Sequence, residues 1–483
     1  MKITVRVQVS AVAEAEDSAQ FSEVFVLERD QLTAASAGLG LAEAHALLTS
    51  IQKAVVCAQA TAAVAEHRFC VRCGRAHRRK DTRTITMRTL FGTLHLDSPR
   101  FMSCACRADD AAGAPATFSP LAATLTQRHT PELVYLQARF AAVMSFDLAA
   151  HLLGEVLPLG RTLHASAVRD QVNAVATRLE GELGPEQCMF VEGCQRDWDQ
   201  LPRPDLPLVV GLDGGYVHSS AQTSRRDGWF EVVAGKSMPT GADGAAKCFA
   251  FVQKIDTKPK RRLFEVLRGQ GMQPNQQVTF LTDGGEDIRD LPLYLNPHSE
   301  HLLDWFHITM RLTVMTNMAK SLRPPPPDPE LPAAAPADPA TEISAQLQRL
   351  KWFLWHGNLF RAQQTIDDII FDLDVDDPGV EQAKLLAAVR EFDGYLRANA
   401  GRIPNYGERH RCGEAISTAF VESTVNQVVA KRMVKKQQMR WSPQGAHLFL
   451  QVRTRVLNDD LAADFARWHP GFTHQSQPMA QAA

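Results

Sequence analysis

The sequence predicts a multidomain α/β protein, and three observations support this fold class. The chain has 483 residues, of which 45% are hydrophobic and 22% are charged, as in ordinary globular proteins. At about 100–200 residues per domain, this length accommodates two to four domains. Four cysteines flank a hairpin pattern near residue 90, and strand and helix patterns alternate between residues 206 and 320.

Charge and cysteine content exclude several classes of protein. The chain has 52 Lys and Arg against 54 Asp and Glu, a net charge of −2, so any DNA affinity would come from local basic patches. Nine cysteines in 483 residues are too few for a disulfide scaffold. The N-terminus lacks a signal-peptide pattern, and no run of about 18 apolar residues occurs. We therefore expect a cytoplasmic protein with reduced thiols and no membrane partner.

The first two segments are an N-terminal region, 1–66, and a zinc-ribbon-like module, 67–107. Weak strand patterns and then a helix rich in Ala and Leu are expected in the first. In the second, apolar and polar residues alternate on both sides of Gly92, which predicts a hairpin. A thiolate pair at each end of a hairpin can bind one structural Zn²⁺ tetrahedrally. The predicted ligands are Cys70, Cys73, Cys104 and Cys106.

Two alternatives to this zinc site stay open. The second cysteine pair is more tightly spaced than usual, so His77 is a substitute ligand, and the thiols could instead be free small hydrophobes. Basic residues within the module suit contacts to DNA phosphates, or form a solvated face. The residues selected for DNA contact are Arg78, Arg79 and Lys80.

Residues 121–200 form a predicted helical region with a helix-turn-helix pattern. A helix at 145–154 is followed by a break with Gly and Pro, and then by a helix at 163–172 that opens near a serine. The break is longer than usual, so two ordinary core helices explain the pattern equally well. If DNA binds here, the contacts would come from Ser166, Arg169 and Gln171.

Residues 205–322 change to a β-β-β-α-β-α-β-α pattern with carboxylates at strand ends. Asp213 and Asp283 each follow an apolar strand and precede two glycines, which would let the backbone pass close to a metal or phosphate. Two carboxylates on neighbouring strands can share Mg²⁺. An ordinary Asp-Gly turn is the alternative at either position.

The last part of the predicted core, residues 416–470, supplies a third carboxylate. Glu422 and Asn426 are four residues apart and therefore share one helix face. The same helix continues into a basic stretch that suits a DNA backbone. The selected basic residues are Lys431, Arg432, Lys435 and Lys436. Between these parts, residues 323–415 read as a Pro-rich linker followed by a helical insertion.

Several motifs together resemble a known family. They are Gly-Leu-Asp-Gly-Gly at 211–215, Leu-Thr-Asp-Gly-Gly at 281–285, Asp-Trp-Phe-His at 304–307, Phe-Val-Glu-Ser-Thr-Val-Asn-Gln at 420–427 and Trp-Ser-Pro-Gln-Gly-Ala-His at 441–447. In this order they resemble the ISKra-type insertion-sequence transposases of the DDE, RNase H-like group. The resemblance extends from about residue 70 to residue 458. It favours Glu422 over the rival carboxylates Glu408 and Glu414.

This resemblance implies an RNase H-like catalytic core with a helical insertion, preceded by the zinc-ribbon-like and helix-turn-helix-like modules. Asp213, Asp283 and Glu422 would hold two Mg²⁺ ions, or Mn²⁺, for DNA cleavage and strand transfer. Asp304 and His307 would support the site together with Asn426. The partners would be double-stranded DNA, both the element's terminal repeats and the target, and further copies of the chain on DNA at the bacterial nucleoid.

Other interpretations use the same residues. A metal-dependent nuclease would need the three carboxylates but no strand transfer. A DNA-binding regulator would keep the zinc and helix-turn-helix modules while the carboxylates did nothing. In the insertion, Trp352, Trp355 and His356 could stack on splayed bases, although core packing is the alternative.

Overall fold

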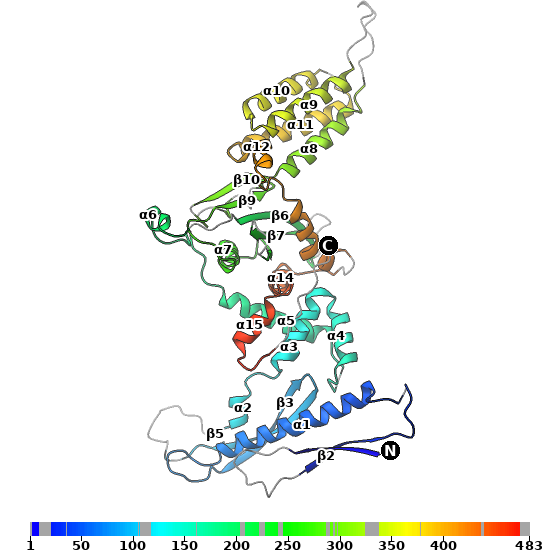
Figure 1. Ribbon diagram of the computed structural model, residues 1–483, viewed down its shortest axis with the longest axis vertical. Coiled ribbons are helices and arrows are strands. Elements are labelled where there is room, and N and C mark those ends of the chain that lie inside the picture. Colours follow the sequence, from blue (N-terminus) through cyan, green and yellow to red (C-terminus); the bar gives the residue numbers. More distant parts are fainter. Residues whose placement is uncertain are drawn as a thin grey trace, which may run out of the picture. The chain divides into compact units, whose positions relative to one another are not determined.

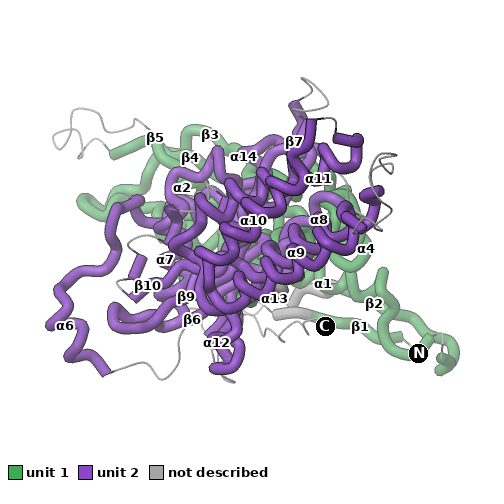
Figure 2. Tube along the Cα trace, turned by 90° about the horizontal axis from the view of Figure 1, so that it is seen from above, with its two compact units in different colours: residues 1–175, 459–483 green, residues 176–458 purple. Residues whose placement is uncertain are grey.

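The computed structural model is a mixed α/β protein, as the sequence predicted, and it divides into two compact units (Figure 2). One unit consists of residues 1–175 and 459–483, and the other of residues 176–458, so the division falls within one helix, α5. The structure describes the whole chain apart from residues 1, 9–20, 35, 105, 107–116, 161, 203–207, 222–227, 240–244, 286–289, 293–294, 297, 324–337, 377, 436–438 and 474–483.

The first unit begins with a two-stranded antiparallel sheet and a long helix (Figure 1). β1 (Lys2–Gln8) pairs with β2 (Phe21–Glu28), and α1 (Leu41–Glu66) follows. An ion pair of 2.5 Å between Arg29 and Glu43 holds the beginning of α1. By length and composition α1 could cross a membrane, but this is weak evidence, because one such helix also occurs in many soluble proteins.

The hairpin predicted around Gly92 is confirmed. β3 (Arg79–Thr89) and β4 (Gly92–Met102) pair antiparallel, and the φ of 128° at Gly92 is one that residues with a side chain rarely adopt. A short strand, β5 (Thr117–Phe118), pairs with the end of β4. The inward-facing residues of the hairpin pack with α1 and the next helix in one small core. This core contains Ile85, Leu94, Leu96 and Leu121, with Val56, Ala60 and Val64 from α1.

The helical pattern predicted for residues 131–183 is also confirmed. Ser145 caps α4, since its hydroxyl accepts a hydrogen bond of 3.2 Å from the amide of Leu148. A late helix returns to this unit, where the rings of Tyr135 and Phe465 lie 5.4 Å apart. The sequence had grouped that late helix with the catalytic core instead. The helices are α2 (Pro120–Thr124), α3 (Pro131–Val143), α4 (Phe146–Val156), α5 (Ala165–Glu182) and α15 (Leu461–Trp468).

The second unit is built on a five-stranded mixed sheet with the order β10-β9-β6-β7-β8. The first three strands in sequence form an antiparallel meander, and β9 and β10 add to the other edge of β6 in parallel. The elements are β6 (Leu208–His218), β7 (Trp229–Pro239), β8 (Lys247–Phe251), α7 (Pro259–Gly269), β9 (Val278–Thr282) and β10 (Ser299–Leu303), with a short α6 (Gln195–Asp199) before them. The sheet therefore follows the predicted β-β-β-α-β order.

Alternate residues of β6 face two different layers. Leu208, Val210 and Leu212 belong to a core that includes Leu263 and Leu267 of α7. The opposite face, which carries Gly211, is covered by α13 (Ala419–Val425) and by η5, a π-helix (Asn426–Val434). The helix that follows η5 in the chain, α14 (Pro443–Leu457), packs against β8. Asp213 is on the face of β6 that α13 covers.

Between β10 and α13 the chain forms a helical insertion with its own core. Buried residues of α8 through α12, such as Leu312, Leu350, Ile369 and Phe392, pack together. Figure 1 shows these helices grouped beside the ends of β9 and β10. They are α8 (Trp305–Ala319), α9 (Pro339–Trp355), α10 (Leu359–Leu373), α11 (Val380–Ala398), the 3₁₀ turn η4 (Ala400–Arg402) and α12 (Tyr406–Arg411).

Some local predictions differ from the structure or lie outside it. The second helix of the predicted β-β-β-α-β-α-β-α pattern, at 287–295, is not seen in the described residues there, which form turns with Leu291 and Leu295 buried. Residues 406–411 carry no clear helix pattern in the sequence but form α12, because Asn405 caps the helix and Tyr406 is buried. Residues 324–337 of the Pro-rich linker, residues 107–116 and the last ten residues fall outside the described residues.

Candidate functional site

The two predicted site aspartates lie on neighbouring parallel strands, but only Asp283 is at a strand end. Asp283 directly follows β9, whereas Asp213 lies in the middle of β6, because pairing with β7 continues the strand through the two glycines to His218. β6 and β9 pair with Gly211 opposite Leu281, so Asp213 and Asp283 each follow two residues further along. The pKa of Asp213 is raised above its usual range. Burial is the largest cause, and the charges of Asp283 and Asp304 add to it, while His307 and the amide of Gly214 act in the opposite direction. The tertiary structure therefore brings Asp213, Asp283, Asp304 and His307 into one electrostatic group.

Asp304 is the centre of a hydrogen-bond network at the start of α8. It is fully buried, and its Oδ1 accepts from the amides of Phe306 (2.9 Å) and Thr418 (3.0 Å). Its Oδ2 accepts from His307 Nδ1 (2.8 Å) and from the Thr418 hydroxyl. Because this carboxylate is occupied by protein donors, it fits the supporting role expected of Asp304 rather than metal ligation.

The acidic neighbours of His307 favour its protonated form. Burial alone lowers the pKa of His307, but the hydrogen bond to Asp304 and the charges of Asp304, Asp213 and Asp283 outweigh it, so the pKa is raised. A protonated imidazole supplies positive charge next to the carboxylates.

Glu422 lies on the helix that covers β6, but its own side chain is exposed to solvent. A Cβ atom built at Gly211 would meet Val421 at 2.0 Å, and one at Gly215 would meet Val425 at 3.1 Å, so α13 and η5 pack directly on these glycines. Glu422, the residue after Val421, is exposed. In the described part of the chain, the ligand atoms of Asp213, Asp283 and Glu422 do not all lie within 4.8 Å of one another.

This packing corrects one expectation drawn from the sequence. Gly215 was expected to leave room for a metal or phosphate, but the space beside it is filled by Val425. The supporting role of Asn426 stays a prediction; in this structure its Oδ1 accepts a hydrogen bond of 2.8 Å from Lys435 Nζ.

The rival carboxylates have structural partners near α12. Glu414 forms an ion pair of 2.8 Å with Arg409, which also binds Glu300 on β10. Glu408 is in the first turn of α12 and accepts a hydrogen bond of 3.4 Å from Asn405 Nδ2. Both side chains therefore stabilise the local fold of the insertion.

The four predicted zinc ligands form a compact sulfur cluster. All four Sγ atoms lie within 4.8 Å of one another, and two pairs, Cys70 with Cys106 and Cys73 with Cys104, are 3.5 Å apart. Tetrahedral zinc with bonds of about 2.3 Å requires sulfur separations of about 3.8 Å. Backbone amides of Cys73 and Arg72 lower the pKa of Cys70 to about 6, which favours the thiolate.

His77 is not part of this cluster. Its Nδ1 lies 3.2 Å from the carbonyl oxygen of Met102, and its ring packs against Phe118 at 4.9 Å. The four-cysteine set is therefore preferred over a set that includes His77.

A second group of side chains that could bind a metal has an arginine side chain at its centre. Glu180, Asp256 and His447 have ligand atoms within 4.8 Å of one another. Arg262 lies among them, donating to Asp256 at 2.8 Å and to Glu180 at 2.8 and 3.0 Å. Because the guanidinium supplies the positive charge, this cluster is a buried ion-pair network rather than a metal site.

The predicted DNA contacts divide by exposure. Arg78, Arg79 and Lys80 are exposed at the start of β3, and Lys431 and Lys435 are exposed on and after η5. Arg169 and Ser166 are exposed on α5, Gln171 is half-buried, and Arg169 pairs with Asp170 at 3.5 Å. Lys436 lies outside the described residues.

Arg432 does not fit the expected role in DNA contact. Its side chain is buried over the ring of Phe449, with 4.7 Å from Cζ to the ring centroid, and near Trp441. Burial lowers the pKa of Arg432 to about 9. The side chain packs η5 against α14, and the sequence pattern of alternating basic residues could not separate it from its exposed neighbours.

The residues of the insertion that the sequence suggested for base stacking differ in their exposure. Trp355 packs in the helical core, with its ring 5.1 Å from that of Trp305. Trp352 is 59% exposed and lies 4.4 Å from the ring of His356. Of the three residues that the sequence suggested for stacking, Trp352 is the exposed one, while Trp355 and His356 are half-buried.

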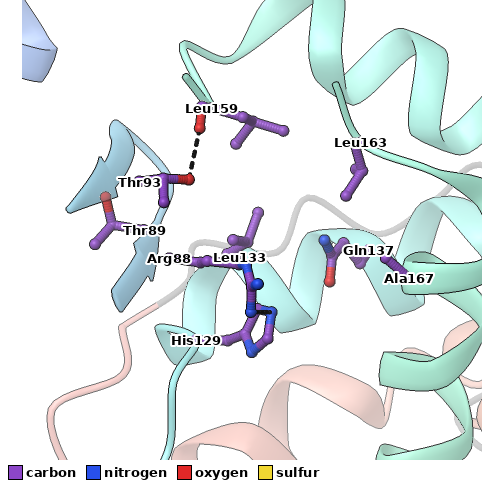
Figure 3. Close-up of a pocket in the computed structure, with 9 residues that line it drawn as sticks. All are labelled: Arg88, Thr89, Thr93, His129, Leu133, Gln137, Leu159, Leu163 and Ala167. Atoms are coloured by element: carbon purple, nitrogen blue, oxygen red, sulfur yellow. Dashed lines mark hydrogen bonds between the residues drawn. The ribbon is translucent and has the colours of Figure 1, made fainter. Parts of the chain in front are cut away.

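A small cavity of about 20 Å³ lies between the hairpin turn and the helices of the first unit (Figure 3). Arg88 and His129 line one side, and Gln137 of α3 points in from another (Figure 3). Beside it, the Thr93 hydroxyl donates to the carbonyl of Leu159 at 2.9 Å. The cavity is the size of one water molecule, so it serves packing rather than ligand binding.

Sequence reasoning missed the contribution of the insertion to the aspartate site. The Tyr395 hydroxyl donates a hydrogen bond of 2.8 Å to the backbone carbonyl of Asp283, and Asn399 lies against Gly284. These residues are more than 110 positions from Asp283, and no local pattern in the sequence links them to it.

Comparison with profiles of known protein families yields no match to this chain, and comparison with curated proteins yields none either. The functional assignment therefore rests on the residues and their arrangement.

Proposed function

We propose that this chain is an insertion-sequence transposase of the DDE type, which cleaves DNA at the element ends and joins it to target DNA. The observation that carries the proposal is the pair Asp213 and Asp283. Asp213 lies within β6, and Asp283 directly follows the adjacent parallel strand β9, in a sheet with β-β-β-α-β order; their charges interact. This is the order that the resemblance implies for an RNase H-like core.

The donor set around these two aspartates fits a divalent cation. Three carboxylates are close enough for the charges of two of them to raise the pKa of Asp213, and a cation between Asp213 and Asp283 would relieve this repulsion. Oxygen ligands of this kind are preferred by Mg²⁺ and Mn²⁺. Asp213 and Asp283 would hold the metal, and Glu422, which is exposed on the covering helix, is the third predicted ligand. Bound Mg²⁺ would activate the attacking hydroxyl and stabilise the leaving oxygen.

The other residues have separate tasks. Asp304 orients His307, whose protonated form would place positive charge beside the carboxylates and could attract a DNA phosphate. The four cysteines would bind one zinc ion, which would hold the segment before β3 to the segment after β4. Exposed Arg78, Arg79 and Lys80 extend from that hairpin and suit contacts to the DNA backbone. Arg169, Lys431 and Lys435 suit further contacts of the same kind.

The test is Mg²⁺-dependent cleavage and joining of the DNA that flanks this reading frame. The wild type is compared with Asp213→Asn, Asp283→Asn and Glu422→Gln. We expect joined products from the wild type only, with DNA binding nearly unchanged in all three variants. Full cleavage by the three variants would overturn the assignment.

The same assay separates the alternatives. Cleavage without joining would identify a nuclease that uses the same carboxylates. Binding without cleavage by any of the proteins would point to a DNA-binding regulator.

A further inference from the structure

The helical insertion contacts the loop that carries Asp283. Tyr395 is near the end of α11, and its hydroxyl donates to the carbonyl oxygen of Asp283 at 2.8 Å. The guanidinium of Arg311, from α8, lies 4.5 Å from the centroid of the Tyr395 ring and holds its other side.

The residue after Asp283 is packed equally closely. Gly284 has a φ of 81°, which side chains disfavour. A Cβ atom at this position would lie 2.8 Å from Asn399 Nδ2 and 2.6 Å from Leu303 Cδ1. Asn399 is buried at the end of α11, so the insertion leaves the loop no room to move toward it.

A third link reaches the residue before Asp283. Arg402 Nε donates to His301 Nδ1 at 3.1 Å, so the proton of the neutral ring is on Nε2. That nitrogen lies 2.8 Å from the hydroxyl of Thr282, which in turn accepts from the amide of Gly284 at 3.1 Å. The turn that follows β9 is therefore held from η4 as well as from α11.

We infer that the helical insertion positions the Asp283 carboxylate for metal binding, with Tyr395 as the principal positioning residue. Residues 282, 283 and 284 are each connected to α11 or η4, either by direct contact or through His301. The insertion can therefore position Asp283 without touching the substrate. Outer partners of metal ligands typically change metal affinity by about 10–100-fold. This inference rests on the proposed function, because it assumes that Asp283 binds a divalent cation.

The experiment measures Mn²⁺ binding to the full-length protein by calorimetry, without DNA, for wild type, Tyr395→Phe, Tyr406→Phe and Asp283→Asn. Tyr406→Phe is a matched control, because Tyr406 is also a buried phenol that donates to a backbone carbonyl, that of Leu303, at 2.8 Å. We expect Tyr395→Phe to weaken Mn²⁺ binding about tenfold. Tyr406→Phe should change it less than about twofold, although both variants lose one hydrogen bond.

Kinetics provide a second readout. Tyr395→Phe should lower kcat for cleavage without changing the KM for DNA, and higher Mn²⁺ should restore part of the rate. Wild-type Mn²⁺ affinity in Tyr395→Phe would overturn the inference and leave the proposed function standing. Absence of Mn²⁺ binding by the wild type, equal to Asp283→Asn, would overturn the proposed metal site and the inference together.

Discussion

Asp304 shows how a single buried carboxylate organises this site. It accepts hydrogen bonds from two backbone amides, a hydroxyl and an imidazole, and it joins α8 to the segment before α13. The four donors belong to Phe306, His307 and Thr418, so this carboxylate links His307, three residues away, to the distant Thr418.

We predict that Asp304→Asn lowers the pKa of His307. The substitution removes the negative charge that raises this pKa, so the imidazole loses its proton at a lower pH. NMR titration of the His307 ring protons measures this, with the other histidines of the same sample as the reference. An unchanged midpoint for His307 would contradict the role of Asp304.

The Arg262 network provides a pH-dependent test of stability. The pKa of Glu180 is about 2 in the folded protein; burial acts to raise it, but hydrogen bonds from His447 and Arg262 lower it more. Glu180 therefore stabilises the fold fully above pH 4.5, the ordinary pKa of a glutamate, and this contribution is lost as pH falls toward 2.

We predict that Glu180→Gln lowers the free energy of unfolding by about 1–2 kcal/mol at pH 7, after allowance for solvent screening. Urea unfolding as a function of pH checks it. The difference between wild type and variant should be constant above about pH 5 and should shrink below that. A difference that grows on acidification would contradict the sign.

At the scale of elements, glycines on β6 let a helix approach the sheet. Val421 and Phe420 occupy the space beside Gly211, and this contact brings α13 over the strand that carries Asp213. The closeness of the helix, rather than a ligand, explains why a glycine is needed at this point.

We predict that Gly211→Ala destabilises the protein by about 1–3 kcal/mol, because the new Cβ would overlap Val421. Adding Val421→Ala should recover part of the loss. Gly154→Ala, in α4, is the control, since nothing lies within 4 Å of its Cβ position, and it should be neutral or slightly stabilising. Equal unfolding midpoints for Gly211→Ala and wild type would contradict this packing.

The cysteine cluster leads to a prediction about metal content. Full-length protein purified without chelator should contain one zinc per chain, and Cys73→Ser should lose it, because four thiolates complete the tetrahedral set. Cys412→Ser is the control, since Cys412 is exposed and outside the cluster. Elemental analysis of the three proteins decides; zinc retained in Cys73→Ser would show that this cluster is not its site.

For the molecule as a whole, charge distribution matters more than net charge. The chain is close to neutral, yet Arg78, Arg79 and Lys80 are exposed together on β3, whereas Arg432 is buried. Affinity for DNA should therefore depend on a few exposed positions.

We predict that Arg79→Ala with Lys80→Ala weakens DNA binding and reduces the slope of log affinity against log salt by about two, one for each lost phosphate contact. Lys384→Ala is the control, because Lys384 is exposed but already pairs with Glu381 at 2.9 Å. Binding measured over a range of salt concentrations tests this, and an unchanged slope would remove the hairpin from the DNA interface.

Sequence patterns alone predicted most of the helices and strands and two groups of residues, the four cysteines and the pair of aspartates. Periodicity located the β3–β4 hairpin, the strands of the central sheet and most helices, because those patterns reflect which side of each element is buried. Cysteine spacing predicted the sulfur cluster, and the position of Asp213 and Asp283 directly after apolar runs predicted that they lie on neighbouring strands. These features depend on local chemistry that a short window of residues contains.

Which side chains surround the predicted site residues could be seen only in the folded chain. It separated buried Arg432 from exposed Lys431, filled the space beside Gly211 and Gly215 with valines, and brought Tyr395 to Asp283. It also filled the Glu180 cluster with a guanidinium rather than a metal. The physical reason is the same in each case: these contacts join residues distant in sequence, and packing selects which side chains meet.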